Sequence, residues 1–144
     1  MIFNNSIFDV VFVALFSAQA LKVVFSIFTE KKVNFRRFLD TGSMPSSHTS
    51  SVVSLATAIF IKEGGGSSIF MLSLVFAVVV MYDATGVRRA AGKQASVLNK
   101  IVENIRKKEG HKIIDKNLKE FLGHTPIEVF GGAILGVIVA ILMM

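Results

Sequence analysis

Two short motifs of this 144-residue chain place a histidine beside residues that could act on a phosphate group. The first is Pro45-Ser46-Ser47-His48, which stands where an apolar segment begins. A helix N-terminus there would offer unpaired N–H groups and a positive dipole end to an anion. Proline fits the first turn because the N–H that it lacks would have no partner within the helix. Ser46 and Ser47 add hydroxyl donors, and the imidazole of His48 titrates near neutral pH, so it is suited to protonate a leaving oxygen. The alternative is that these residues only start the helix.

The second motif is Gly123-His124-Thr125-Pro126-Ile127-Glu128, at the start of the last apolar segment. The four-residue spacing lets Glu128 lie beside His124 and hold one ring nitrogen, which frees the other nitrogen for attack on phosphorus. The same residues also fit a capping box, with Thr125 as N-cap and Glu128 three residues after it. A catalytic and a structural role for Glu128 are equally compatible with the sequence, and both can hold at once.

Three cations are candidates for binding the phosphate itself. Arg88 and Arg89 follow the third apolar segment, and a guanidinium group binds phosphate with bidentate geometry. Lys22 lies inside the first apolar segment, where a buried lysine is usually functional but one near a helix end can also snorkel to the surface. Simple flanking of the membrane is the alternative for the arginines. We expect Asp83 to pair with one of them, and we expect no metal or cofactor, because no cluster of acids with metal spacing surrounds Asp83.

The elements that must position these residues are membrane helices. The chain is 52% hydrophobic with a mean hydropathy of +0.61, and a bilayer core about 30 Å thick needs about 20 mostly apolar residues per helix. We therefore predict one domain, residues 1–144, that is an all-α integral membrane bundle of about four transmembrane helices. The predicted helices cover residues of about 7–28, 46–61, 68–82 and 126–144. Gly132-x-x-x-Gly136 in the last helix indicates close helix packing, although chance in a glycine-rich helix explains it equally well.

An amphipathic helical insertion, residues of about 93–122, is predicted between the third and fourth helices. Val97, Leu98 and Ile101 recur at helical spacing, and so do Ile114 and Leu118 after Gly110. These segments could lie on lipid headgroups or cover the mouth of the bundle, and a solvated basic loop is the alternative.

Charge gathers on one side of the predicted bundle. All sixteen Lys and Arg residues except Lys22 and Lys62 lie in residues 29–43 and 83–125, which include the further candidates Arg36 and Arg37. The positive-inside rule then puts these loops in the cytoplasm and both termini outside, although a phosphate site would gather cations on either side. The net charge of +6 indicates anionic lipid rather than nucleic acid as the partner, because the cations lie between apolar segments. The absence of cysteine excludes disulfides and thiolate catalysis.

Four helices would bring all the candidate residues to one membrane face. The motifs that carry these residues resemble those of the type 2 phosphatidic acid phosphatase (PAP2) family. Most similar is its divergent branch of small membrane proteins. The stretch from Pro45 to His48 resembles the family's P-S-G-H motif, with Ser47 in place of Gly. GHTPIEVFGGAILG, from Gly123 to Gly136, is similar to the family's last motif, with Glu128 in place of Asp. Family members commonly have six helices, and the four here resemble the last four.

The resemblance implies roles for the candidate residues. His124 would form a phosphohistidine, Glu128 would orient it, and His48 would protonate the leaving group. Lys22 with Arg88 or Arg89 would bind phosphate, although the family's usual spacing of its first lysine and arginine does not occur here.

These observations together predict a multi-pass membrane phosphatase that hydrolyses a lipid phosphate or diphosphate without a cofactor. Transfer of the phosphoryl group to an alcohol would use the same residues. A degenerate member that only binds lipid phosphate is also compatible with the sequence, and so is a small four-helix transporter or scaffold. A transporter would be expected to carry its ionisable residues near the middle of the bilayer rather than at one face. A homo-oligomer is compatible with the sequence.

Overall fold

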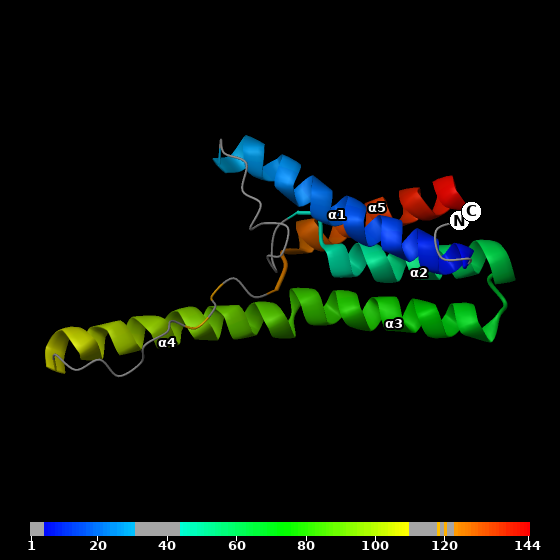
Figure 1. Cartoon of the computed structure of the whole chain (residues 1–144). Coiled ribbons are helices and arrows are strands. Elements are labelled where there is room, and N and C mark those ends of the chain that lie inside the picture. Colours follow the sequence, from blue (N-terminus) through cyan, green and yellow to red (C-terminus); the bar gives the residue numbers. More distant parts are fainter. Residues whose placement is uncertain (1–4, 31–43, 110–117, 119, 121–122) are drawn as a thin grey trace.

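The computed structural model describes residues 5–30, 44–109, 118, 120 and 123–144, and these residues form helices and no strands (Figure 1). The helices are α1 (Ser6–Glu30), α2 (Ser47–Glu63), α3 (Ser68–Thr85), α4 (Val87–Glu109) and α5 (Pro126–Met143). Three stretches are long and apolar enough to cross a membrane: Ser6–Ile27 in α1, Ser68–Ile105 in α3 and α4, and Pro126–Met143, which is α5. The predicted all-α membrane bundle is confirmed.

The shorter helix α2, with 17 residues, packs against α1, α3 and α5. Its buried residues are serine, threonine or alanine, apart from Ile59. Ser51 Oγ donates to the Ser47 carbonyl at 2.9 Å and Ser54 Oγ to the Ser51 carbonyl at 2.9 Å, so these hydroxyls are satisfied inside the helix. A helix with such short, internally bonded side chains can lie in the middle of a membrane bundle without unpaired polar groups.

Helix α5 approaches α2 along its two spaced glycines. A Cβ on Gly132 would overlap the carbonyl oxygen of Ser46, and a Cβ on Gly136 would lie 2.6 Å from the carbonyl oxygen of Ser50. The Gly-x-x-x-Gly spacing therefore forms the contact between α5 and α2, and side chains there would push the helices apart.

One face of α1 is buried along most of its length. Val10, Ala14, Ala18, Lys22 and Ser26 follow one another at four-residue spacing, and each is at most 3% exposed. Residues four apart share a helix face, so Lys22 belongs to the face that packs on the bundle. Ser50 Oγ of α2 donates to the Ala14 carbonyl at 3.3 Å on this face.

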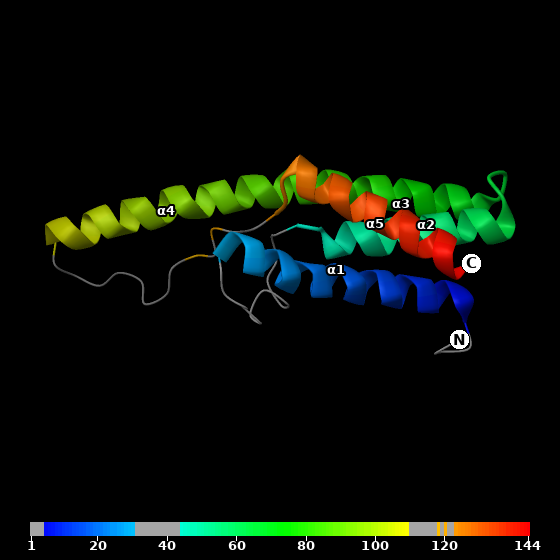
Figure 2. The same cartoon turned by 90° about the horizontal axis from the view of Figure 1, so that it is seen from above.

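Helix α4 continues the line of α3 and projects beyond the ends of the other helices (Figures 1 and 2). The helical hydrogen bonds carry on across the junction, from Gly86 N to Tyr82 O at 2.8 Å and from Ala90 N to Gly86 O at 2.9 Å. Helix α4 thus corresponds to the first part of the predicted amphipathic insertion and lies between α3 and α5 in the chain. Most of the second predicted amphipathic segment, which contains Ile114, lies outside the described residues.

Candidate functional site

The predicted nucleophile His124 lies just before α5 and is fixed to the junction of α3 and α4. Its backbone N–H donates to the Ala84 carbonyl at 2.9 Å. The preceding Gly123 has φ +88°, and a Cβ there would overlap the backbone N of Arg89, so only glycine fits. The tight turn therefore holds the His124 ring, which is 5% exposed, at the end of the bundle where α3 passes into α4.

One carboxylate oxygen of Glu128 contacts both His124 and the backbone at the start of α5. His124 Nδ1 lies 3.3 Å from Glu128 Oε2, and the Thr125 backbone N–H donates to that Oε2 at 2.8 Å. Glu128 N donates to Thr125 Oγ1 at 3.4 Å, which completes the capping box. A carboxylate can only accept, so the proton of the neutral ring lies on Nδ1 and the Nε2 lone pair is free. The capping and orienting geometries predicted for Glu128 are both present.

The surroundings of His124 keep its ring neutral. Burial lowers the pKa of His124 below its ordinary value of 6.5. The Glu128 carboxylate opposes this shift, and the charges of Lys22 and His48 add to it. The net direction is downward, so the ring is mainly neutral at pH 7 and its Nε2 can act as a nucleophile.

The start of α2 is fixed by the first turn of α5. Ser46 is the N-cap of α2 and is fully buried; its Oγ accepts from Thr49 N at 3.3 Å and from Thr49 Oγ1 at 2.9 Å. Its backbone N–H donates to the Glu128 carbonyl at 3.0 Å. One residue of α5 thus contacts His124 with its side chain and the N-terminus of α2 with its main chain.

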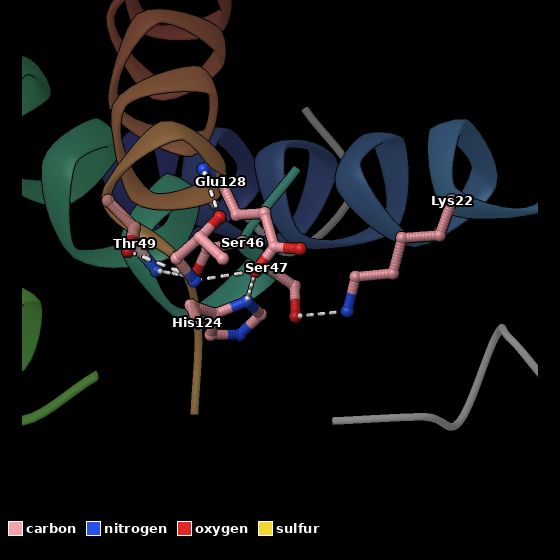
Figure 3. A network of polar contacts seen from close by, with 7 residues as sticks. Lys22, Ser46, Ser47, Thr49, His124 and Glu128 are labelled. Carbon is pink, nitrogen blue, oxygen red and sulfur yellow. Dashed lines mark hydrogen bonds and ion pairs between the residues drawn. The ribbon is translucent and has the colours of Figure 1, made fainter. Parts of the chain in front are cut away.

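Lys22 reaches this N-terminus from α1 (Figure 3). The residue is 2% exposed, and its Nζ donates to Ser47 Oγ at 3.3 Å. The side chain therefore points into the bundle and does not snorkel outward. It delivers a positive charge beside the hydroxyl of a helix N-terminus, a combination that suits an anion.

His48 and Arg88 are two further predicted site residues, and both are exposed. The His48 side chain is exposed at the surface, but partial burial of its ring, together with the charges of Arg88 and Lys22, lowers its pKa below the ordinary 6.5. Arg88 Nε donates to Asp83 Oδ2 at 2.6 Å, which confirms the ion pair predicted for Asp83. Arg89 contributes its backbone, against which Gly123 packs.

The structure gathers the predicted residues at one end of the bundle, from α1, α2, the α3–α4 junction and the start of α5. Arg36 and Arg37 lie outside the described residues. Two contributors were missed from the sequence: Thr49, which supports the Ser46 cap, and the Ala84 carbonyl, which holds the His124 main chain. Nothing in the sequence distinguishes Ala84, whereas the glycine before His124 was a readable sign of a tight approach. Within the described part of the chain, no three His, Asp or Glu side chains are grouped as metal ligands.

Comparisons with known proteins show which family the chain resembles. Residues 3–139 match the sequence model of the Divergent PAP2 family. The chain is 40% identical over 139 residues to the "Uncharacterized membrane protein YuiD" of Bacillus subtilis (strain 168), and the alignment covers 90% of this chain and 88% of that relative. No solved structure matches the chain. The family expected from the two histidine motifs is thereby confirmed.

Proposed function

This chain belongs to the Divergent PAP2 family, and from this premise we propose that it is a membrane phosphatase that hydrolyses a lipid phosphate or diphosphate. The observation that carries the proposal is the His124–Glu128 pair, with Nδ1 and Oε2 3.3 Å apart at the end of the bundle. A buried, neutral imidazole whose Nδ1 is held by a carboxylate has the properties of an activated nucleophile.

In the first step, Nε2 of His124 attacks the phosphorus atom, a P–N bond forms, and the P–O bond to the lipid breaks. His48, in its protonated form, gives a proton to the leaving oxygen and becomes neutral, and the Glu128 carboxylate stabilises the positive charge that develops on the His124 ring. Lys22 and the N–H groups at the start of α2 bind the phosphoryl oxygens while their negative charge redistributes. Ser47 lies between these two sets of donors, since it already accepts from Lys22.

In the second step, water replaces the lipid. The neutral His48 takes a proton from the water as its oxygen attacks phosphorus, the P–N bond breaks, and inorganic phosphate leaves. The electron pair of that bond returns to Nε2, so His124 is again the neutral nucleophile. No oxidant, reductant or cofactor is needed for this cycle.

A lipid is the substrate class that the position of the residues favours. They lie at the ends of membrane helices, at the depth of a headgroup, and apolar side chains of α1 and α5 such as Phe25 and Phe130 are exposed nearby along the bundle. Phosphatidate, phosphatidylglycerol phosphate and isoprenoid phosphates all present a phosphate with an apolar tail at this depth. A transporter is less well supported, because the two histidines lie at helix ends rather than midway along them.

The test is phosphate release by the purified full-length protein in detergent, with each of these lipids and without added metal. His124→Ala and His48→Ala should lose release, whereas His111→Ala, which changes the histidine that the proposed mechanism does not use, should keep it. Brief incubation with a ³²P-labelled substrate should leave acid-labile, base-stable label on the wild type and none on His124→Ala. Release that persists in His124→Ala would overturn the mechanism. Tight lipid-phosphate binding without turnover in the wild type would favour a non-catalytic, lipid-binding role.

A further inference from the structure

Helix α4 carries an exposed apolar face. Helix α3 has 18 residues, about 27 Å at 1.5 Å per residue, so it fills the bilayer core before α4 begins. Arg88 and Arg89 in the first turn of α4 exclude it from that core. Yet Val97 and Ile101 of α4, the helix that projects beyond the bundle (Figures 1 and 2), are 57% and 48% exposed.

The exposed face has the spacing of a coiled-coil seam. Its members alternate at three and four residues, as the a and d positions of heptads do, and all of them are exposed. We define the α4 seam as Val87, Ala90, Gln94, Val97, Ile101 and Asn104.

The opposite face of α4 is already occupied by the chain itself. Gly92 and Ala95 are buried there, and Asn99 Nδ2 donates to the Leu118 carbonyl at 2.9 Å and to Glu120 Oε1 at 2.8 Å. Asn99 is nine residues from Ala90, which is half a turn around a helix at 100° per residue. Leu118 and Glu120 therefore lie against one side of α4, and the α4 seam lies on the other side.

The two edges of the α4 seam differ, and the difference selects one way of pairing. One edge carries Lys93, Lys100 and Lys107, and the other carries Ala91 and Leu98. A parallel pair sets the lysine edge of each helix against the apolar edge of the other, where the lysine stems can cover apolar surface. An antiparallel pair would set lysine against lysine. Two copies inserted in the same sense in a bilayer can only present α4 in parallel, so the face is self-complementary in the arrangement that the membrane allows.

We propose that the α4 seam binds the α4 seam of a second copy, as a short parallel coiled coil just outside the membrane. Gln94 and Asn104 then face their counterparts, and their side-chain amides can bond across the axis, which favours the in-register pairing. Insertion in the same bilayer holds the two helices in the same direction, so a small seam is enough for pairing. The α4 seam uses other side chains than the histidine site, and pairing through it does not depend on catalysis.

The absence of cysteine from the chain allows a clean cross-linking test. Val97→Cys places a thiol in the α4 seam, and Ser96→Cys, its neighbour, places one on the occupied side. Each full-length variant is reconstituted in liposomes of phosphatidylcholine and phosphatidylglycerol and oxidised with copper phenanthroline. We expect Val97→Cys to double its apparent mass on a non-reducing gel over a wide range of protein-to-lipid ratios, and Ser96→Cys to stay monomeric.

A second pair of variants fixes the direction and controls for folding. Ala90→Cys chains and Ile101→Cys chains that carry tags of different size should give no mixed band. In a parallel, in-register pair the two thiols would lie about 16 Å apart along the helix axis, because the positions are 11 residues apart. Val97→Asp, added to Ala90→Cys, should abolish cross-linking while helicity stays unchanged. A monomeric Val97→Cys would overturn the proposal, whether its thiol is shielded by the chain's own segment or by lipid, and so would equal cross-linking of Ser96→Cys.

Discussion

Oε2 of Glu128 lies 3.3 Å from Nδ1 of His124 and accepts the backbone N–H of Thr125 at 2.8 Å. The oxygen that caps α5 is therefore the oxygen that orients the proposed nucleophile. Because the cap fixes where α5 begins, it also fixes the height of the His124 ring relative to the N-terminus of α2. Substitutions at Glu128 can separate the two roles.

Glu128→Gln should retain the cap and lose the catalytic effect. Glutamine can fill the same place in a capping box, but it cannot stabilise an imidazolium ring. We expect phosphate release to fall by about 10²-fold or more, the scale of a positioned acid–base group, with little change in melting temperature. Glu128→Ala should lose about 1 kcal/mol of stability as well, because the Thr125 N–H loses its acceptor. Equal rates for the wild type and Glu128→Gln would contradict the orienting role.

The acid limb of the pH–rate profile should lie below pH 6.5. The neutral form of His124 attacks phosphorus, so activity is lost as pH falls through its pKa, and burial lowers that pKa below the ordinary 6.5. Glu128→Gln removes the carboxylate that raises the pKa, so its acid limb should move to still lower pH. The measurement is kcat/KM against pH for both proteins. A limb that moves to higher pH in Glu128→Gln would contradict the electrostatic account.

The lowered pKa of His124 also makes the free energy of unfolding depend on pH. Below pH 6.5 the unfolded chain takes up a proton on His124 while the folded chain does not, so the free energy of unfolding should fall as pH drops from 6.5 toward the folded pKa. His124→Gln should lose part of this dependence. Denaturation in detergent at a series of pH values, with the wild type and His124→Gln side by side, measures the difference. Identical pH dependence in the two proteins would contradict a lowered His124 pKa.

Much of this arrangement could be predicted from local sequence patterns. The cap at Thr125 and the approach of Glu128 to His124 follow from residues within one helical turn. The burial of Lys22 could not be predicted, because a lysine near a helix end can point either way and its partner Ser47 comes from another helix. The continuation of α3 into α4 could not be predicted either, because Gly86 is typical of a helix end. Only the hydrogen bonds that Gly86 N and Ala90 N donate across the junction show that the helix continues. The direction of the Lys22 side chain and the continuation of α3 into α4 depend on contacts between residues that are far apart in the sequence.

Two neighbouring serines should give opposite results when they are replaced by alanine. Ser46→Ala removes the fully buried N-cap of α2 and leaves Thr49 without its acceptor, so we expect a loss of about 1–2 kcal/mol of stability. Ser47→Ala leaves the cap intact but removes the hydroxyl that meets Lys22, so KM should rise while the melting temperature changes little. Thermal unfolding and steady-state kinetics on both variants check this. A similar loss of stability in both would contradict the separation of roles.

Arg88 should matter more than Arg89 for catalysis. Arg88 lies near enough to His48 for its charge to act on that ring, and Asp83 holds its Nε at 2.6 Å, so we expect its guanidinium to contact a phosphate bound beside His48; Arg89 contributes its backbone, against which Gly123 packs. We expect Arg88→Ala to lower kcat/KM about 10- to 100-fold, equivalent to about 1.5–3 kcal/mol for a hydrogen bond to a charged group. Arg89→Ala should retain most activity. A greater loss in Arg89→Ala would assign the phosphate contact to Arg89 instead.

The contact between α5 and α2 should be sensitive to a single methyl group at Gly136. A Cβ there would lie 2.6 Å from the Ser50 carbonyl oxygen and 3.0 Å from Ser54 N, and neither backbone atom can move alone. Gly136→Ala should therefore cost about 1–3 kcal/mol, as overpacking of a tight contact does. Gly131→Ala is the matched control, because its Cβ would meet the flexible end of Met44 at 3.1 Å. Unfolding in mixed detergent micelles measures both variants. Equal stability of Gly136→Ala and Gly131→Ala would show that α5 does not approach α2 as closely as described, and the main-chain link from Ser46 to Glu128 would then need another support.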